Sequence, residues 1–68
     1  MSAKELLDVC ERIRIDQLWS RYDLARNMNL SYTTLVRLER YPETCAMKSR
    51  RKLVAFVNHW QYKKPALS

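Results

Sequence analysis

Residues 21–40, RYDLARNMNLSYTTLVRLER, constrain the chain most, because they predict two short helices that meet at a tight turn. Ser20 is placed to cap the first helix, with Asp23 completing a capping box, and Ser31 is placed to cap the second. The turn between them requires a residue that tolerates positive φ. Since the chain contains no glycine, Asn29 is the least costly residue for this position.

The apolar residues of this stretch fall on one face of each predicted helix. They are Leu24, Ala25 and Met28 in the first helix, Leu35 and Leu38 in the second, and Leu30 between them. The opposite face of the second helix carries Tyr32, Thr33, Val36, Arg37 and Arg40. A helix that reads DNA requires such a division, with one face in the core and one face able to form hydrogen bonds.

These residues resemble the helix-turn-helix of the phage repressor/Cro superfamily, also called the Xre-type family. The positions that fit its pattern are Leu24, Ala25, Met28, Leu30, Leu35 and Leu38, and Leu38-Glu39-Arg40 resembles its common Leu-Glu-Arg ending. Asn29 stands where the family usually has glycine, and Arg21 where it often has glutamine. The resemblance covers residues 5–60 but is specific only over the central helix pair.

The charge of the chain favours a polyanionic partner. The 68 residues carry a net charge of +6. Residues 1–23 sum to −1 and residues 24–68 to +7, so the basic excess lies on and after the predicted reading helix. Such a distribution is typical of nucleic-acid-binding proteins, although a basic surface also serves solubility.

The whole chain predicts an all-α, compact four-helix bundle. Helices are expected at residues 3–17, opened by a Ser2–Glu5 capping box, and at residues 21–27, 32–41 and 45–61. Pro42 ends the third helix, residues 42–45 form a loop, and Thr44 is expected to cap the fourth helix. The apolar face of that last helix is expected to comprise Met47, Leu53, Val54, Phe56, Val57 and Trp60. We expect a single DNA-binding domain over residues 1–61 and a frayed tail over residues 62–68.

The candidate contacts divide between bases and phosphates. Tyr32 and Thr33 match the family's base-contacting positions, and Arg37 can bond guanine O6 and N7 bidentately. The expected phosphate contacts are Arg21, Ser31, Thr34, Arg40, Thr44, Lys48 and Arg51. Other interpretations remain open for these residues. The basic run 48–52 can be a solvated face, and Arg40 can form a surface ion pair. Tyr32 can pack over Leu35, and Arg21 can support Tyr32 instead of binding phosphate.

The family resemblance further implies a structural salt bridge between Arg14 and Glu39. Glu39 directly follows core Leu38, so its carboxylate need not face DNA. The alternative is a surface ion pair of Glu39 with Arg40 or Lys48.

Other function classes find little support. No nucleophile is arranged around the single histidine, so we expect no enzyme, and no cofactor or small-molecule ligand is evident. Cys10 and Cys45 are expected to be reduced thiols, and with His59 they lack the spacing of a metal site. No apolar run approaches the roughly 20 residues of a membrane span, so we expect a cytoplasmic protein.

The sequence therefore predicts a sequence-specific, double-stranded-DNA-binding transcriptional regulator. The resemblance suggests a repressor of a phage, plasmid or other mobile-element promoter, acting as a homodimer on an inverted-repeat operator. One alternative is an architectural factor of the excisionase or transposition type, which would bend DNA. The other is a helical adaptor that binds a protein and has no operator.

Overall fold

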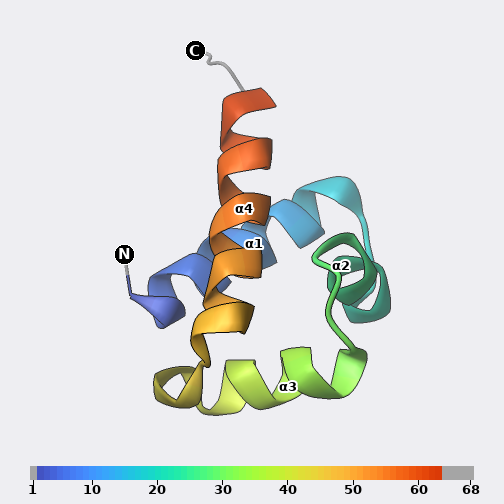
Figure 1. Cartoon of the computed structure of the whole chain (residues 1–68). Coiled ribbons are helices and arrows are strands. Elements are labelled where there is room, and N and C mark those ends of the chain that lie inside the picture. Colours follow the sequence, from blue (N-terminus) through green and yellow to red (C-terminus); the bar gives the residue numbers. More distant parts are fainter. Residues whose placement is uncertain (1, 64–68) are drawn as a thin grey trace.

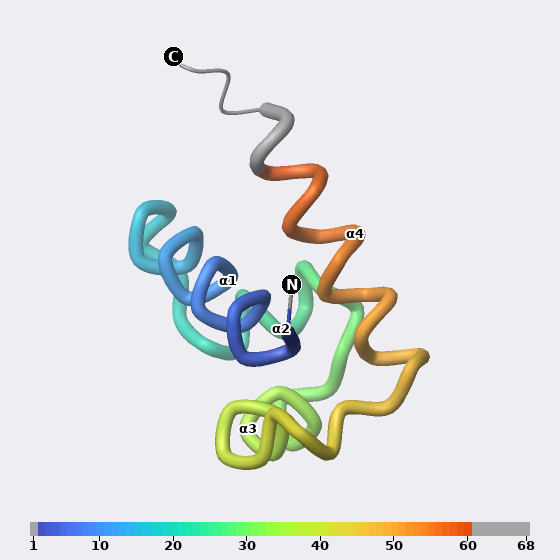
Figure 2. Tube along the Cα trace, turned by 90° about the vertical axis from the view of Figure 1, so that its left-hand side faces the viewer, coloured from blue at the N-terminus to red at the C-terminus, as the bar shows by residue number. Residues whose placement is uncertain are grey.

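The computed structural model describes residues 2–63, with the side chains of residues 2–60, and shows an all-helical protein. Its elements in chain order are α1 (Ala3–Gln17), α2 (Arg21–Asn27), α3 (Tyr32–Arg40), the short 3-10 helix η1 (Pro42–Thr44) and α4 (Met47–Lys63). Figure 1 shows α3 lying across one end of the molecule, below α2, while α4 stands in front of α1. A quarter turn brings α3 almost end-on and shows α4 extending past the other helices (Figure 2).

The helix starts follow the predicted caps. Ser2 and Glu5 form a capping box at α1, and Ser20 and Asp23 form a second one at α2. The Ser31 hydroxyl accepts a hydrogen bond from the Thr34 amide at the start of α3, at 3.1 Å. Each cap satisfies an amide that has no partner within its helix, which explains why the chain turns into a helix at these residues.

One core joins all four helices. Its buried side chains are Leu6, Leu7, Cys10, Ile13, Leu24, Ala25, Met28, Leu35, Leu38, Leu53, Phe56 and Val57. Trp19 and Trp60 pack against this core from the side, with their ring centroids 5.3 Å apart in an edge-on arrangement. Burial raises the pKa of the Cys10 thiol to about 12, so this cysteine behaves as a core residue and not as a reactive group.

The structure corrects the predicted boundaries around α4. Helix α3 ends at Arg40, one residue earlier than expected, because Tyr41 precedes proline and has a non-helical backbone (φ −132°, ψ 69°). The chain then forms η1, in which the Thr44 hydroxyl donates to the Tyr41 carbonyl at 2.8 Å. Thr44 therefore lies in η1 and does not cap α4, which begins at Met47.

Two further expectations for α4 are wrong. Met47 is 66% exposed, because the later start of the helix leaves it outside the core. The helix continues to Lys63, past the predicted end at residue 61, so the expected tail at residues 62–68 is helical at its start. Residues 64–68 lie outside the described part of the chain.

Two residues occupy the left-handed region of backbone conformation, where glycine is usual. Asn29, at φ 60°, confirms the expected turn between α2 and α3. Leu18 has the same φ and ends α1, donating its amide to the carbonyls of Arg14 and Ile15. Its side chain is 91% exposed, so no buried contact offsets the steric cost of this conformation.

Leu18→Gly is expected to raise the free energy of unfolding by about 0.5–1 kcal/mol. Relief of the left-handed strain, roughly 1–2 kcal/mol, exceeds the added entropy of glycine in the unfolded chain, roughly 0.5–1 kcal/mol. Urea denaturation measures the change. Ile15→Gly is the matched control, since Ile15 is also exposed but helical, and it should destabilise. A loss of stability in Leu18→Gly would contradict the explanation.

Candidate nucleic-acid interface

Helices α2 and α3 meet at a turn that the rest of the protein holds in place. The Leu30 amide donates to the Ala25 carbonyl at 2.9 Å, which closes the end of α2. From α4, the Lys52 ammonium group donates to the carbonyl of Asn29 at 2.9 Å. A lysine beside the carbonyl end of a helix is electrostatically favourable, so this contact ties α4 to the turn that orients α3.

The outer face of α3 is accessible and carries the predicted base contacts. Tyr32, Thr33, Val36, Arg37, Arg40 and Tyr41 line one shallow surface hollow along the helix. Leu35 and Leu38, on the opposite face, are buried in the core. The structure thus brings together Tyr32, Thr33 and Arg37, with Arg40 beside them.

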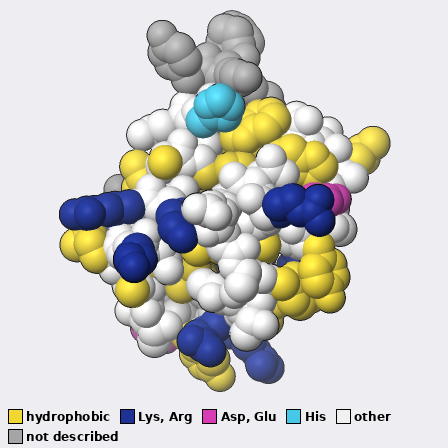
Figure 3. Space-filling view, turned by 45° about the vertical axis from the view of Figure 1, so that its right-hand side comes forward, with side chains coloured by type: hydrophobic (Ala, Val, Ile, Leu, Met, Phe, Trp, Pro, Cys, Tyr) yellow, Lys and Arg dark blue, Asp and Glu magenta, His cyan; other side chains and the backbone are white. Residues whose placement is uncertain are grey.

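Four of the predicted phosphate contacts are exposed on three consecutive elements. Arg40, Thr44, Lys48 and Arg51 are exposed on α3, η1 and the first turns of α4. Arg51 does not share the hollow of α3 but lines a separate one on α4, with Met47 and Val54. Figure 3 shows lysine and arginine side chains scattered over one face, with acidic side chains visible only at its edges.

Two hydroxyl groups at the start of α3 are coupled. The Ser31 hydroxyl donates to Thr34 Oγ1 at 2.8 Å while it accepts from the Thr34 amide. Since one proton serves the bond between the two hydroxyls, the pair keeps one hydroxyl proton to donate. The two predicted phosphate contacts can therefore offer one hydroxyl donor to a phosphate oxygen between them.

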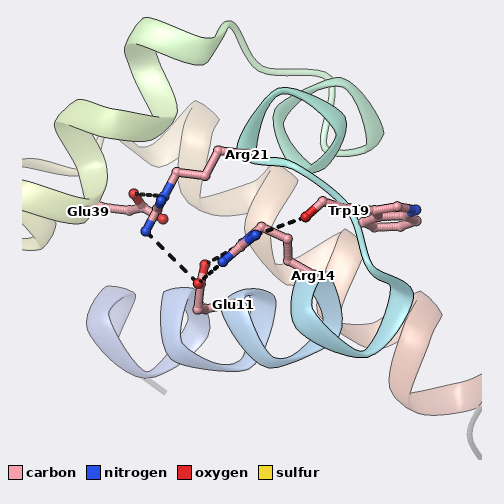
Figure 4. Close-up of polar contacts among 5 residues, drawn as sticks. All are labelled: Glu11, Arg14, Trp19, Arg21 and Glu39. Atoms are coloured by element: carbon pink, nitrogen blue, oxygen red, sulfur yellow. Dashed lines mark hydrogen bonds and ion pairs between the residues drawn. The ribbon is translucent and has the colours of Figure 1, made fainter.

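An ion-pair network behind α3 replaces the predicted Arg14–Glu39 bridge (Figure 4). Glu39 accepts from Arg21 Nε at 3.1 Å, and Arg21 Nη2 lies 4.0 Å from Glu11 Oε2. Glu11 holds Arg14 with both carboxylate oxygens, and Arg14 also donates to the Trp19 carbonyl at 2.8 Å. Among the described residues Arg14 and Glu39 are thus linked only indirectly.

The network shows why Arg14 and Glu39 do not pair directly. Glu11 lies one turn before Arg14 on the same helix, so it reaches the Arg14 guanidinium at less conformational cost than Glu39 does. Glu39 is then left to Arg21, and neither Arg40 nor Lys48 is its partner. Arg21 bonds Glu39 and lies near Glu11, so it joins α1, α2 and α3, but 47% of its side chain is exposed and its contact with phosphate stays a prediction.

The contacts of this network shift the pKa values of Glu11 and Arg14. The hydrogen bond from Arg14 holds the pKa of Glu11 below its usual value, despite partial burial. The pKa of Arg14 is raised, chiefly by its bond to Glu11, with a smaller contribution from the carboxylate of Glu39. Electrostatic interaction thus connects Arg14 to Glu39, although no bond does.

Sequence reasoning missed three residues that shape this region: Glu11, Lys52 and Tyr22. The three-residue spacing of Glu11 and Arg14 was a readable signal for their pairing. Lys52 belongs to the basic run 48–52, and its side chain donates to the carbonyl of Asn29, 23 residues earlier. Nothing in the sequence pattern distinguishes such a lysine from its basic neighbours. Tyr22 stacks on Tyr32 across the two helices, at a centroid distance of 4.1 Å. Their sequence separation matches no local pattern.

Comparisons with family models, with curated proteins and with solved structures find no match to this chain. None of the described helices has both the length and the apolar character needed to cross a membrane. Within the same residues, no three histidine, cysteine, aspartate or glutamate side chains gather in a metal-binding arrangement.

Stability should fall on acidification, in part through Glu11. The pKa of Glu11 is lower in the folded protein than in the unfolded chain, so Glu11 contributes fully to the free energy of unfolding above about pH 5. This contribution is lost as the pH drops below about 4, through the folded-state pKa. Urea midpoints measured between pH 6 and about 3 should therefore decline less in Glu11→Gln than in the wild type. Asp8→Asn, which removes an exposed carboxylate from the same helix, is the control, and an equal flattening there would contradict a specific role of Glu11.

Proposed function

We propose that this protein is a sequence-specific, double-stranded-DNA-binding transcriptional regulator that reads the major groove with α3. The observation that carries this proposal is the division of α3 into a buried face and an exposed one. Leu35 and Leu38 fix the helix in the core, while Thr33 and Arg37 present a hydroxyl and a guanidinium group to solvent. An α-helix with its side chains is about 10–12 Å across, which fits a major groove about 12 Å wide, and the nine residues of α3 extend roughly 13.5 Å.

The surrounding charge supports duplex DNA as the partner. Lys48 and Arg51 are exposed near the start of α4, where positive charge is unfavourable to the helix dipole. A bound phosphate would reverse that sign, because amides and cations would then share one anion. With a net charge of +6, the chain should approach DNA by long-range attraction.

The size of the reading helix supports a dimer. One short helix contacts about 4–6 base pairs, too few to identify a site in a genome. A homodimer on an inverted repeat doubles the sequence read, and occlusion of a promoter by such a dimer would repress it. The resemblance to phage repressors suggests the promoter of a phage, plasmid or other mobile element.

A protein-binding adaptor is the second candidate, and a specific observation favours it. Ile15 and Leu18, at the end of α1, are 57% and 91% exposed, and such apolar side chains are common at protein contacts. This candidate predicts no enriched DNA sequence.

An architectural factor of the excisionase type would instead bend its DNA, which gel mobility of circularly permuted fragments detects.

Selection from random duplexes at about 0.15 M salt tests the proposal. We expect a short motif of about 4–6 base pairs, repeated in inverted orientation. Absence of any enriched motif, with the protein folded, would refute sequence-specific recognition.

Arg51→Ala should weaken binding to operator and random DNA alike and lower the salt slope by about 1. A phosphate contact supplies affinity without sequence information, so both substrates lose equally. Affinities at several salt concentrations measure the slope. Arg12→Ala is the control, because it removes the same charge from an exposed position on α1, and it should leave the slope unchanged. An unchanged slope in Arg51→Ala would place Arg51 on a solvated face.

Arg37→Ala should cost about 1–3 kcal/mol on the operator and much less on random DNA. The reason is loss of a bidentate contact to one guanine, which no other side chain replaces. Competition binding with the two DNAs measures the difference. Equal losses on both would make Arg37 a phosphate contact instead.

A further inference from the structure

Two tyrosines from different helices stack at the corner between α2 and α3. Tyr22 belongs to the first turn of α2 and Tyr32 is the first residue of α3. Their ring centroids lie 4.1 Å apart, with an angle of 13° between the rings. Tyr22 is 62% exposed and Tyr32 is 37% exposed, so the pair lies on the surface and outside the core.

The position of the pair connects it to the outer face of α3. Tyr32 lines the hollow along α3 and also a second hollow at the α2–α3 corner, where Tyr22 and Arg26 lie. Its ring therefore stands between the two hollows, at the N-terminal end of the face that carries Thr33 and Arg37. Figure 1 shows this corner, with α2 above one end of α3.

The stack restricts a side chain that would otherwise rotate freely. An exposed tyrosine at the start of a helix has several accessible rotamers, and binding would have to select one of them. A ring stacked on a neighbouring helix has already lost that freedom. The ring edge of Tyr32 is thus held in one place relative to α3 before any ligand arrives.

We propose that Tyr22 is a positioning residue for base recognition, because its stacking holds Tyr32 against one base pair at the edge of the half-site. The proposal rests on the proposed function, in which α3 enters the major groove. The base read is thymine, since the edge of an aromatic ring offers an apolar contact to the C5-methyl group. Tyr22 acts through Tyr32 and needs no contact with the base.

The test repeats the duplex selection with Tyr22→Ala, Tyr22→Leu, Tyr22→Phe, Tyr32→Ala and the Tyr22→Ala/Tyr32→Ala double variant. Tyr22→Ala, Tyr22→Leu and Tyr32→Ala should each lose at least about 5-fold discrimination at the same single thymine position. Tyr22→Phe keeps the flat ring and should retain the wild-type motif. The double variant should lose no more than the single ones, because both changes remove one coupled contact.

A uracil substitution isolates the methyl group. Replacing that thymine by uracil should weaken wild-type binding by about 5-fold and leave Tyr22→Ala unaffected. Because Tyr22 is largely exposed, its variants should melt like the wild type, and Tyr22→Leu keeps apolar bulk should alanine reduce folding.

The outcomes separate this inference from the proposed function. If the wild-type protein selects no motif, both are refuted. If it selects a motif that Tyr22→Ala and Tyr22→Leu leave unchanged, only the positioning role is refuted. Losses at different positions for Tyr22 and Tyr32 variants, or a Tyr22→Phe variant as defective as Tyr22→Ala, would also overturn the role of the stack.

Discussion

Burial of Leu35 and Leu38 is the constraint on which the rest of the structure depends. Leu35 is completely buried and Leu38 almost so, and these two side chains bind a nine-residue helix to the core. A helix this short has no independent stability, because most helical stability in proteins comes from packing of an apolar face. Its buried face therefore decides which residues point outward, and these include Thr33 and Arg37.

Polar contacts then fix the angle of that helix. Arg21 joins Glu39 of α3 to Glu11 of α1, and Lys52 of α4 bonds the carbonyl of Asn29 in the turn before α3. Each pair is at least partly exposed, so each contributes modestly to stability. These contacts nevertheless connect α3, or the turn before it, to every other helix, which the proposed base recognition requires if side chains are to meet base edges in register.

The sequence predicted the fold well where local chemistry decides it. The serine caps and the apolar periodicity gave the starts of α1, α2 and α3, because these signals act within one turn of helix. The start of α4 was misplaced, since a threonine that can cap a helix can equally bond the Tyr41 carbonyl within η1. The spacing of the apolar residues in α3 also predicted which face of that helix is exposed. Choosing between Glu11 and Glu39 as the partner of Arg14 required distances between helices, and the Tyr22–Tyr32 stack likewise has no local signature.

An NMR titration with duplex DNA tests the central claim most directly, because it locates the contact surface residue by residue in a chain small enough for complete assignment. Addition of a duplex carrying the selected motif should shift the amide signals of α3 most, followed by those of η1 and the first turns of α4. The amides of α1 should change little. Shifts concentrated at the end of α1 around Leu18, with α3 unaffected, would contradict recognition of DNA by α3.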